Sequence, residues 1–443
     1  MADSEHYSSG AVRTRRSASA PDDVREIVGG RRLVTHRRSN APARLRIGSR
    51  MARAAFFLSA LGPGVIGLCA DNDAGGMLSY LVTGASHDLG WMLPVLLVLV
   101  LPTVFIQGVA SRVAQATRLP YSKALISGVG KPLVIVEALA LYGINTFILV
   151  TEFVGMSLAL ALLGIPVPVG LLGTLGLVLY LTRAQVYPRI ERLLLFSALA
   201  NLAFIPALLV LHRRPHALTM AFSAAHAVNP WFLLLAMAGN AIAPWMIYWQ
   251  HNAVWAGAER TRRQRRWDLS TGVVAMVVMA VIVLLLGAFT PGSEAAFASP
   301  VSWIFHEGGP LAGSLFAVGL FDAGLVACCT VSLSSLWAVR EATGRGAHHP
   351  CEAPNRGKWM SVHVTTLVAA ALVVMTPHLS AGWLALWAQA AGALWMPVSL
   401  LFLWMVARNR RIMGQAALGT GAQVGLVAIA AGFLVVGWLG LLG

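Results

Sequence analysis

The chain has 443 residues, of which 57% are hydrophobic and only 12% are charged, and its formal net charge is +15. Because a soluble globular domain carries about twice this share of charged residues, the composition excludes an ordinary soluble domain and indicates a membrane protein. The Lys and Arg residues are concentrated at the amino-terminal end and scattered in short gaps between apolar runs. This distribution excludes the continuous basic face that binds a nucleic acid.

Residues 1–53 differ in composition from the rest. They are rich in Arg, Ser, Ala and Pro, and they contain 12 of the 33 Lys and Arg residues. The segment has no apolar run followed by a small-residue cleavage site, so it does not resemble a secretory signal. We predict a disordered, basic cytoplasmic arm, either solvated or in contact with anionic lipid headgroups. A single transmembrane domain is expected over residues 54–443.

The rest of the chain consists of apolar runs long enough to cross a bilayer. A membrane-spanning helix needs about 20 mostly apolar residues, because lipid offers no partner for unpaired backbone groups. We predict an all-α integral membrane protein with eleven transmembrane helices, in the runs 55–83, 90–111, 132–163, 166–182, 190–212, 230–257, 267–290, 311–339, 359–376, 382–407 and 419–441.

The charged gaps between these runs predict the orientation of the chain. With the amino terminus inside, the gaps on the inside carry 19 Lys and Arg residues, whereas those on the outside carry only Arg213 and Arg214. Since cytoplasmic loops are enriched in basic residues, we expect a cytoplasmic amino terminus and, after an odd number of spans, an extracellular carboxyl terminus. The protein is therefore expected in the cell membrane.

Two of the runs contain residues that interrupt a helix near its middle. The first interruption is "CADNDAGGM" at 69–77, where two glycines widen the allowed backbone angles and polar side chains compete for backbone hydrogen bonds. The second is "AGNAIAPWMIYWQHN" at 238–252, where Pro244 cannot donate to the preceding turn and Asn240 is expected in the unwound part. Broken spans are the best indication in a sequence of a transport site.

Unwound backbone at membrane depth releases carbonyl oxygens, which together with carboxylates and amides suit hard cations. An ionised carboxylate in lipid costs several kcal/mol unless it is paired, hydrated or neutralised, so Asp71 and Asp73 need an explanation. We predict that Asp73 binds a cation. The alternative is that one of the two aspartates caps the downstream half-helix and the other faces water.

Other polar groups are weaker indications of function. Glu137, Glu152 and Asp322 lie within apolar runs, where they either pair with neighbouring helices or take part in function. The stretch "HHPCE" at 348–352 has metal-ligand residue types but no second cluster, and we expect an exposed loop there. The four Cys residues show no paired spacing, so neither a disulfide nor a zinc site is expected.

The two interrupted stretches resemble those of the Nramp family of divalent-metal transporters. "GPGVIGLCADNDAGG" resembles the first helix of the family, whose Asp-Pro-Gly-Asn hallmark falls on residues 73–76, and "GNAIAPWMIYWQHNAV" resembles its sixth helix. Weaker matches continue along the chain, so the resemblance covers about residues 52–440. It implies a leucine-transporter-like fold of two inverted five-helix repeats and an eleventh helix, with helices 1 and 6 broken and the site between them.

Several positions depart from the family pattern. Asp73 keeps the metal-binding aspartate, but the family's Asn falls on Gly76 and its metal-binding Met falls on Ala243. The Ala that supplies a carbonyl ligand falls on Asn240, and of the acidic proton route in the third helix only Glu152 remains. The family's other titratable positions fall on Tyr142, Leu149 and Trp245.

These departures resemble the Nramp-related magnesium transporter branch. The resemblance implies a secondary transporter of Mg²⁺ and/or Mn²⁺ that works by alternating access without proton coupling, is not an enzyme and needs no cofactor. A thioether favours transition metals whereas Mg²⁺ prefers oxygen, so Ala243 in place of Met agrees with this interpretation. The implied site consists of Asp73, the side chain of Asn240, carbonyls near Ala70 and Ala241, and Asp71, which adds negative potential at the mouth.

Three alternatives stay open. One is a proton-coupled Mn²⁺/Fe²⁺ symporter of the typical Nramp kind, and another is a carrier of amino acids or other organic solutes on the same fold. Two aspartates at the first break disfavour the anionic group of an amino acid. The third is a membrane sensor or scaffold that binds metal without moving it. The expected partners are a divalent cation and the lipid bilayer, and the oligomeric state stays open.

Overall fold

The structure of the protein, a computed structural model, describes residues 62–86, 89–183, 193–211, 228–257, 261–289, 300–344, 358–376 and 378–442. The predicted amino-terminal arm and the "HHPCE" stretch lie outside these residues. Within this part of the chain the regular structure is entirely helical, as the apolar runs predict.

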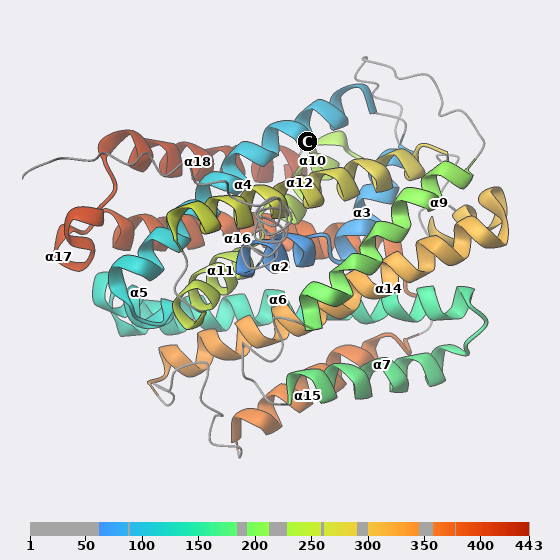
Figure 1. Ribbon diagram of the computed structural model, residues 1–443, viewed down its shortest axis with the longest axis horizontal. Helices are drawn as coiled ribbons and strands as arrows, with labels where there is room; N and C mark the ends of the chain where they lie inside the picture. The colour runs from blue at the N-terminus through green and yellow to red at the C-terminus, as the bar shows by residue number, and fades with distance from the viewer. Residues whose placement is uncertain are drawn as a thin grey trace, which may run out of the picture. The chain divides into compact units, whose positions relative to one another are not determined.

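The helices follow the predicted runs in chain order, as Figure 1 shows. Their bounds are α2 Pro63–Asp71, α3 Ala74–Ala85, α4 Leu89–Thr117, α5 Tyr121–Val129, α6 Lys131–Leu162, α7 Val167–Thr182, η1 Ala198–Ala203, α9 Phe204–Val210, α10 Pro230–Ala241, α11 Pro244–Ala256, α12 Arg262–Gly287, α14 Pro300–Ala342, α15 Lys358–Val373, α16 Ala381–Ala407, α17 Arg410–Met413, η2 Gly414–Ala416 and α18 Thr420–Leu442.

Among the described residues, eight helical segments are long and apolar enough to cross a membrane. Two further apolar helices, Val167–Thr182 and Trp359–Val373, are shorter. The first predicted run is divided between α2 and α3, and each half is too short to span a bilayer alone. Every predicted run contains at least one helix among the described residues. The number of long apolar helices shows that the chain is a multi-pass membrane protein.

Two helices begin earlier than the hydropathy of the sequence predicts. α12 starts within the arginine-rich segment because Thr261 and Gln264 form a capping box, in which each side chain bonds to the other residue's backbone nitrogen. α14 starts at Pro300 and bends at Gly309, whose φ is 75°. The early start of α12 could not be predicted from hydropathy, because helix capping does not depend on the apolar pattern that predicts a span.

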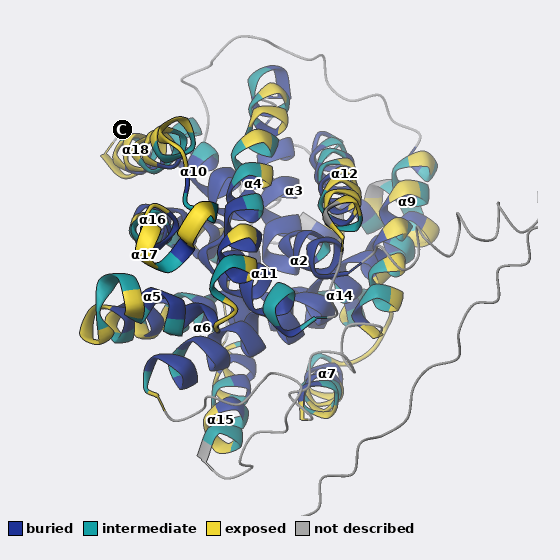
Figure 2. Cartoon of the chain, turned by 60° about the vertical axis from the view of Figure 1, so that its left-hand side comes forward, coloured by how far each residue is buried: buried dark blue, intermediate teal, exposed yellow. Residues whose placement is uncertain are grey.

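α2 and α3 lie in the interior of the helical domain, and nearly all of their residues are buried. α12 packs along both of them, and α6 packs along α14. Figure 2 shows exposed faces on the peripheral helices α7, α9 and α18, which carry apolar side chains such as Leu172, Leu209 and Leu434. These faces suit contact with lipid, so polar residues on the central helices need another explanation.

Candidate cation site

The first break separates α2 from α3 at the predicted position. α2 ends at Asp71, and α3 begins at Ala74 with Asp73 as its N-cap residue. The carboxylate of Asp73 accepts a hydrogen bond from the backbone nitrogen of Gly76. Capping of the downstream half-helix, the alternative to cation binding, is therefore one role of Asp73.

Glu152 of α6 holds the start of α3. Its carboxylate accepts hydrogen bonds from the backbone nitrogens of Ala74 and Gly75, at 2.7 and 3.4 Å. In an unbroken helix those amides would bond to the carbonyls of Ala70 and Asp71, four residues earlier. The two carbonyl oxygens therefore do not accept the backbone hydrogen bonds of a continuous helix. The sequence predicts such a freed carbonyl near Ala70.

The second break separates α10 from α11, and it also lies where the sequence predicts it. α10 ends at Ala241, and α11 begins at Pro244, which has no backbone hydrogen to donate. Ile242 and Ala243 connect the two half-helices in non-helical conformations. The carbonyl oxygen of Ala241 accepts a 3.0 Å hydrogen bond from the hydroxyl of Thr103 in α4.

Asn240 reaches the first break from the last turn of α10. The backbone there is helical, with the amide of Ile242 bonded to the carbonyl of Ala238 at 3.1 Å. The prediction that Asn240 lies in unwound backbone is wrong, because Pro244 removes only the hydrogen-bond partner of the Asn240 carbonyl. The carboxamide occupies the space where a side chain on Gly76 would begin, so it bridges α10 and α3.

Several polar atoms around the breaks are buried without a hydrogen bond of normal geometry. They include Oδ2 of Asp71, both amide atoms of Asn240 and the hydroxyl of Tyr80. Asp71 is 2% exposed and Asn240 1%, so both residues are buried in this conformation. Asp71 also lies close enough to Asp73 for their charges to repel. An unsatisfied buried polar atom costs about 1–3 kcal/mol, and a cation between these oxygens would remove that cost.

Most of the donor atoms near the breaks are hard oxygens. Within the described residues, no group of three or more His, Cys, Asp and Glu side chains converges to hold a metal ion. A cation at the breaks would therefore bind the aspartates, an amide oxygen and released carbonyls, with water completing its shell. Such oxygen ligands suit Mg²⁺ and Mn²⁺ rather than zinc or copper.

Gln389 of α16 is a polar residue at the first break that sequence reasoning missed. Its Nε2 donates to Oδ1 of Asp73 at 3.0 Å. Gly76 donates to the same oxygen, so both bonds leave Oδ2 of Asp73 for a further partner. The available signal was that the apolar run 382–407 contains a single Gln.

Met246 places a thioether at the second break, which sequence reasoning also missed. Its sulfur accepts a hydrogen bond from the backbone nitrogen of Ala243 at 3.4 Å. Met246 lies in the first turn of α11, three residues after Ala243, the position on which the family's Met falls. A soft sulfur is therefore present beside the break, where it caps the backbone.

Apart from Glu152, the positions that match the family's titratable groups carry side chains of other types. The hydroxyl of Tyr142 bonds to Thr366 of α15, and Leu149 and Trp245 are buried. Neither a phenol, whose pKa is ordinarily about 10, nor an indole changes its protonation state near neutral pH. Glu152, the remaining carboxylate of the route, is occupied by the backbone amides of α3.

The other buried carboxylates pair with neighbouring helices. Glu137 of α6 accepts hydrogen bonds from Trp395 at 2.8 Å and Ser399 at 2.6 Å, both in α16. Asp322 of α14 accepts a 2.6 Å hydrogen bond from Asn201 in η1. These contacts hold helices together and lie outside the two breaks.

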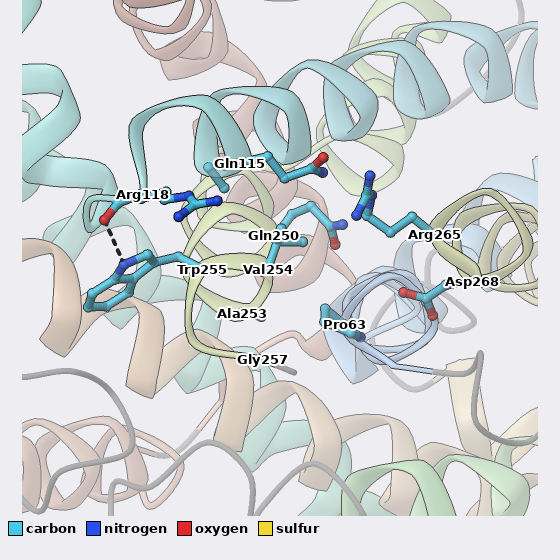
Figure 3. A pocket seen from close by; sticks show the side chains of 11 residues that line it. Pro63, Gln115, Arg118, Gln250, Ala253, Val254, Trp255, Gly257, Arg265 and Asp268 are labelled. Atoms are coloured by element: carbon cyan, nitrogen blue, oxygen red, sulfur yellow. Dashed lines mark hydrogen bonds between the residues drawn. The ribbon is translucent and has the colours of Figure 1, made fainter. Parts of the chain in front are cut away.

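A cavity of about 520 Å³ lies beside the end of α2 that is farther from the break, as Figure 3 shows. Pro63 of α2, Gln250 of α11, and Arg265 and Asp268 of α12 are among the residues that line it. Neither aspartate of the first break lines this cavity. Asp71, Asp73 and Asn240 are all buried, so the candidate cation site is enclosed in this conformation.

Comparison with known proteins bears on the family. A family model described as natural resistance-associated macrophage protein-like, or Nramp, matches residues 64–442. A search of curated proteins finds no match.

Solved structures of transporters are similar to the chain. A manganese transporter from Eremococcus coleocola, in complex with an aromatic bis-isothiourea substituted compound, is 17% identical with a TM-score of 0.66, over 87% of this chain and 85% of that one. A mutant of the same transporter has a TM-score of 0.68 at the same identity and coverage. Mhp1, a nucleobase-cation-symport-1 family transporter in a closed conformation with bromovinylhydantoin bound, is 13% identical with a TM-score of 0.54, over 86% and 89% of the two chains.

At these identities the solved structures show a shared transporter fold, and the family is shown by the family model, which matches most of the chain. The all-helical membrane domain and its two broken helices agree with that match. The chain belongs to the Nramp family of membrane transporters and is not an enzyme.

Proposed function

We propose that the protein carries the divalent cations Mg²⁺ and Mn²⁺ across the cell membrane by alternating access, without proton coupling and without a cofactor. The observation that carries the proposal is the group of buried, unsatisfied oxygens of Asp71 and Asn240 beside Asp73, between two broken helices. Family membership supports a divalent metal as cargo, and the similarity to a protein named a manganese transporter supports Mn²⁺.

Charge favours a dication over an organic solute. Asp71 and Asp73 together offset two positive charges in a region from which water is largely excluded. An amino acid would instead place its carboxylate next to two like charges, which is unfavourable in a medium of low dielectric. The proposed ligands are Asp73, Asp71, the amide oxygen of Asn240, and the carbonyl oxygens of Ala70 and Ala241.

The positions of Asn240 and Gly76 support a complete oxygen shell despite the departure from the family pattern. Gly76 offers no side-chain oxygen, but the carboxamide of Asn240 lies over it. The amide ligand would therefore come from α10 instead of α3. Ala243 leaves room for a retained water, which suits Mg²⁺ because this ion loses its hydration shell reluctantly.

Selectivity depends on the thioether of Met246. Its sulfur is held by the backbone of Ala243, which supports a site in which oxygen dominates. If the sulfur turned toward the cation, the site would favour softer metals such as Cd²⁺. The presence of this sulfur beside the break supports a second candidate function, a carrier of Mn²⁺ and Fe²⁺ of the typical Nramp kind.

The basic segments after α4 and before α12 lie at the same end of the domain. The segment after α4 contacts α11: the indole of Trp255 donates to the carbonyl of Arg118 at 3.1 Å, and His251 contacts the carbonyl of Leu119 at 2.9 Å. α12 starts after this end of α11 with a run of arginines. Loops rich in Lys and Arg remain on the cytoplasmic side, so we assign this end to the cytoplasm and the carboxyl terminus to the outside.

Uptake of metal into proteoliposomes tests the proposal. Liposomes that contain a trapped Mg²⁺- or Mn²⁺-sensitive dye should report uptake by the wild type. Asp73→Asn keeps the size of the side chain but removes the charge that offsets the desolvation of a dication, so the uptake rate should fall to nearly the background of empty liposomes.

Glu137→Gln is the matched control, because Glu137 is a buried carboxylate bonded only to α16 side chains. It should retain most of the wild-type rate. Uptake by Asp73→Asn at the wild-type rate would place the site elsewhere, and no uptake by folded wild-type protein would favour a sensor or scaffold.

A further inference from the structure

α12 lies along both halves of the first broken helix and contacts them in different ways. At Gly272 it leaves no space for a side chain against α2, because a Cβ added there would lie 2.8 Å from the carbonyl oxygen of Gly64. At the break, the amide of Asn72 donates to the carbonyl of Met276 at 2.9 Å. α12 therefore follows α2 from its start to the break.

Asp268 of α12 binds the first turn of α2 through the backbone. Its carboxylate accepts hydrogen bonds from the backbone nitrogens of Gly62 at 2.7 Å, Gly64 at 2.9 Å and Val65 at 3.1 Å. Asp268 is 3% exposed, so water competes little for these bonds. One carboxylate thus satisfies three of the amides that the start of a helix leaves without partners.

The other half-helix, α3, is held by steric contacts as well as by hydrogen bonds. Gly84 of α3 and Gly287 of α12 each lie against the backbone of the opposite helix, where a side chain has no room. Glu152 holds the start of α3 at the same time. Close backbone contacts therefore hold both halves against α12, at Gly84 and Gly287 for α3 and at Gly272 for α2. The first amides of α2 differ in that they depend on the single carboxylate of Asp268.

The cavity beside this turn gives α2 space to move. It has a volume of about 520 Å³ and is lined by Pro63 at the start of α2 and by Asp268 itself. Figure 3 shows Asp268 pointing from α12 toward the turn that begins at Pro63. A change in the position of this turn would carry Asp71 and the carbonyl of Ala70, at the other end of the same short helix.

We propose that Asp268 is a positioning residue that fixes α2 on α12 from outside the cation site, and that release of its three hydrogen bonds lets α2 pivot at the break between Asn72 and Asp73. When Asp268 holds α2, Asp71 and the carbonyl of Ala70 are aligned with Asp73. When its hydrogen bonds are released, α2 no longer keeps these two ligands in line with Asp73. The inference rests on the proposed function for its role in transport, but the tie between Asp268 and α2 can be tested without transport.

Cys69 is a native reporter on α2. It is partly exposed, whereas Cys328 and Cys329 of α14 are buried. With Cys351 replaced by Ser, the rate at which N-ethylmaleimide modifies Cys69 in proteoliposomes measures the mobility of α2. Asp268→Asn removes the charge and one acceptor, so we expect the modification rate to rise roughly tenfold.

Two variants make the measurement specific. Asp268→Glu restores the charge and should stay within about twofold of the wild-type rate, because a carboxylate can still accept the amide hydrogens. Glu137→Gln removes a similarly buried carboxylate whose hydrogen bonds go to α16 and not to α2. This variant should leave the modification rate of Cys69 unchanged. Saturating Mn²⁺ should slow the modification in wild type and have a smaller effect in Asp268→Asn.

Transport kinetics give a second readout. Asp268→Asn should raise KM for Mn²⁺ several-fold, because α2 no longer holds its ligands in place, and Asp268→Glu should recover most of the loss. A modification rate of Asp268→Asn within twofold of wild type, or an equal rise in Glu137→Gln, would overturn the proposal. Absence of metal uptake in every protein, with the expected change in Cys69, would instead refute only the transport function.

A milder variant covers the case in which Asp268→Asn does not fold. A Cβ on Gly64 would lie 3.0 Å from Oδ2 of Asp268, so Gly64→Ala displaces the carboxylate without removing it. The modification rate of Cys69 should then rise about threefold, since the bonds are lengthened rather than lost. An unchanged rate in Gly64→Ala would overturn the proposal by itself.

Discussion

The carboxamide of Asn240 lies where a side chain on Gly76 would begin, so these two positions have room for only one side chain between them. Both amide atoms are buried without hydrogen bonds of normal geometry. In a protein interior such a group is costly unless something binds to it. We infer that the two residues depend on each other: residue 76 of α3 is a glycine because the carboxamide of Asn240 in α10 fills the space beside it.

A double-mutant cycle tests this match. Gly76→Asn alone should collide with Asn240 and lower the free energy of unfolding by about 1–3 kcal/mol, as overpacking does in other cores. Adding Asn240→Ala should restore both stability and Mn²⁺ affinity, because the amide then comes from α3. The melting temperature and Mn²⁺ binding of the four proteins give the coupling energy. Additive effects of the two substitutions would show that the positions are independent.

A second residue-scale prediction concerns the softness of the site. Ala243→Met should add a thioether and expel a water, which shifts preference from Mg²⁺ toward Cd²⁺ by roughly ten- to a hundredfold, or about 1–3 kcal/mol. Met246→Leu removes the thioether already present and should leave Mg²⁺ transport intact while weakening Cd²⁺ inhibition. Inhibition of Mn²⁺ uptake by each ion in the two variants checks this. Stronger Cd²⁺ inhibition in Met246→Leu would contradict the role given to sulfur.

At the scale of elements, the first broken helix is fixed by carboxylates from two neighbours. Glu152 of α6 binds the start of α3, and Asp268 of α12 binds the start of α2. A half-helix of this length lacks partners for most of its first amides, so each needs an acceptor from elsewhere in the fold. The role of Glu152 in α6 is therefore accounted for by helix capping.

This arrangement predicts that metal movement through the protein is not accompanied by protons. α6 carries Tyr142 and Leu149 where the family pattern has acids, and its remaining Glu152 is engaged by backbone amides. Mn²⁺ uptake into liposomes with a trapped pH dye should cause no change in internal pH. An acidification that depends on Mn²⁺ and disappears in Glu152→Gln would show that the carboxylate relays protons after all.

For the whole molecule, hydropathy and the two interruptions were enough to predict the helical membrane fold and the position of both breaks. The breaks could be predicted because glycine and proline act locally on the backbone. The burial of Asp71, the helical backbone at Asn240 and the contacts of Gln389 and Met246 could not. These depend on which helices meet in space, and no local pattern in the sequence carries that information.

We propose that two breaks in one membrane domain form a site for a hard divalent cation. Competition during Mn²⁺ uptake into proteoliposomes tests this site, because Mg²⁺ and Cd²⁺ differ in their preference for oxygen and sulfur. We expect wild-type uptake of Mn²⁺ to be inhibited by millimolar Mg²⁺, and Mg²⁺ itself to be transported. Uptake that is indifferent to millimolar Mg²⁺ and blocked by micromolar Cd²⁺ would contradict the account and identify a carrier of transition metals.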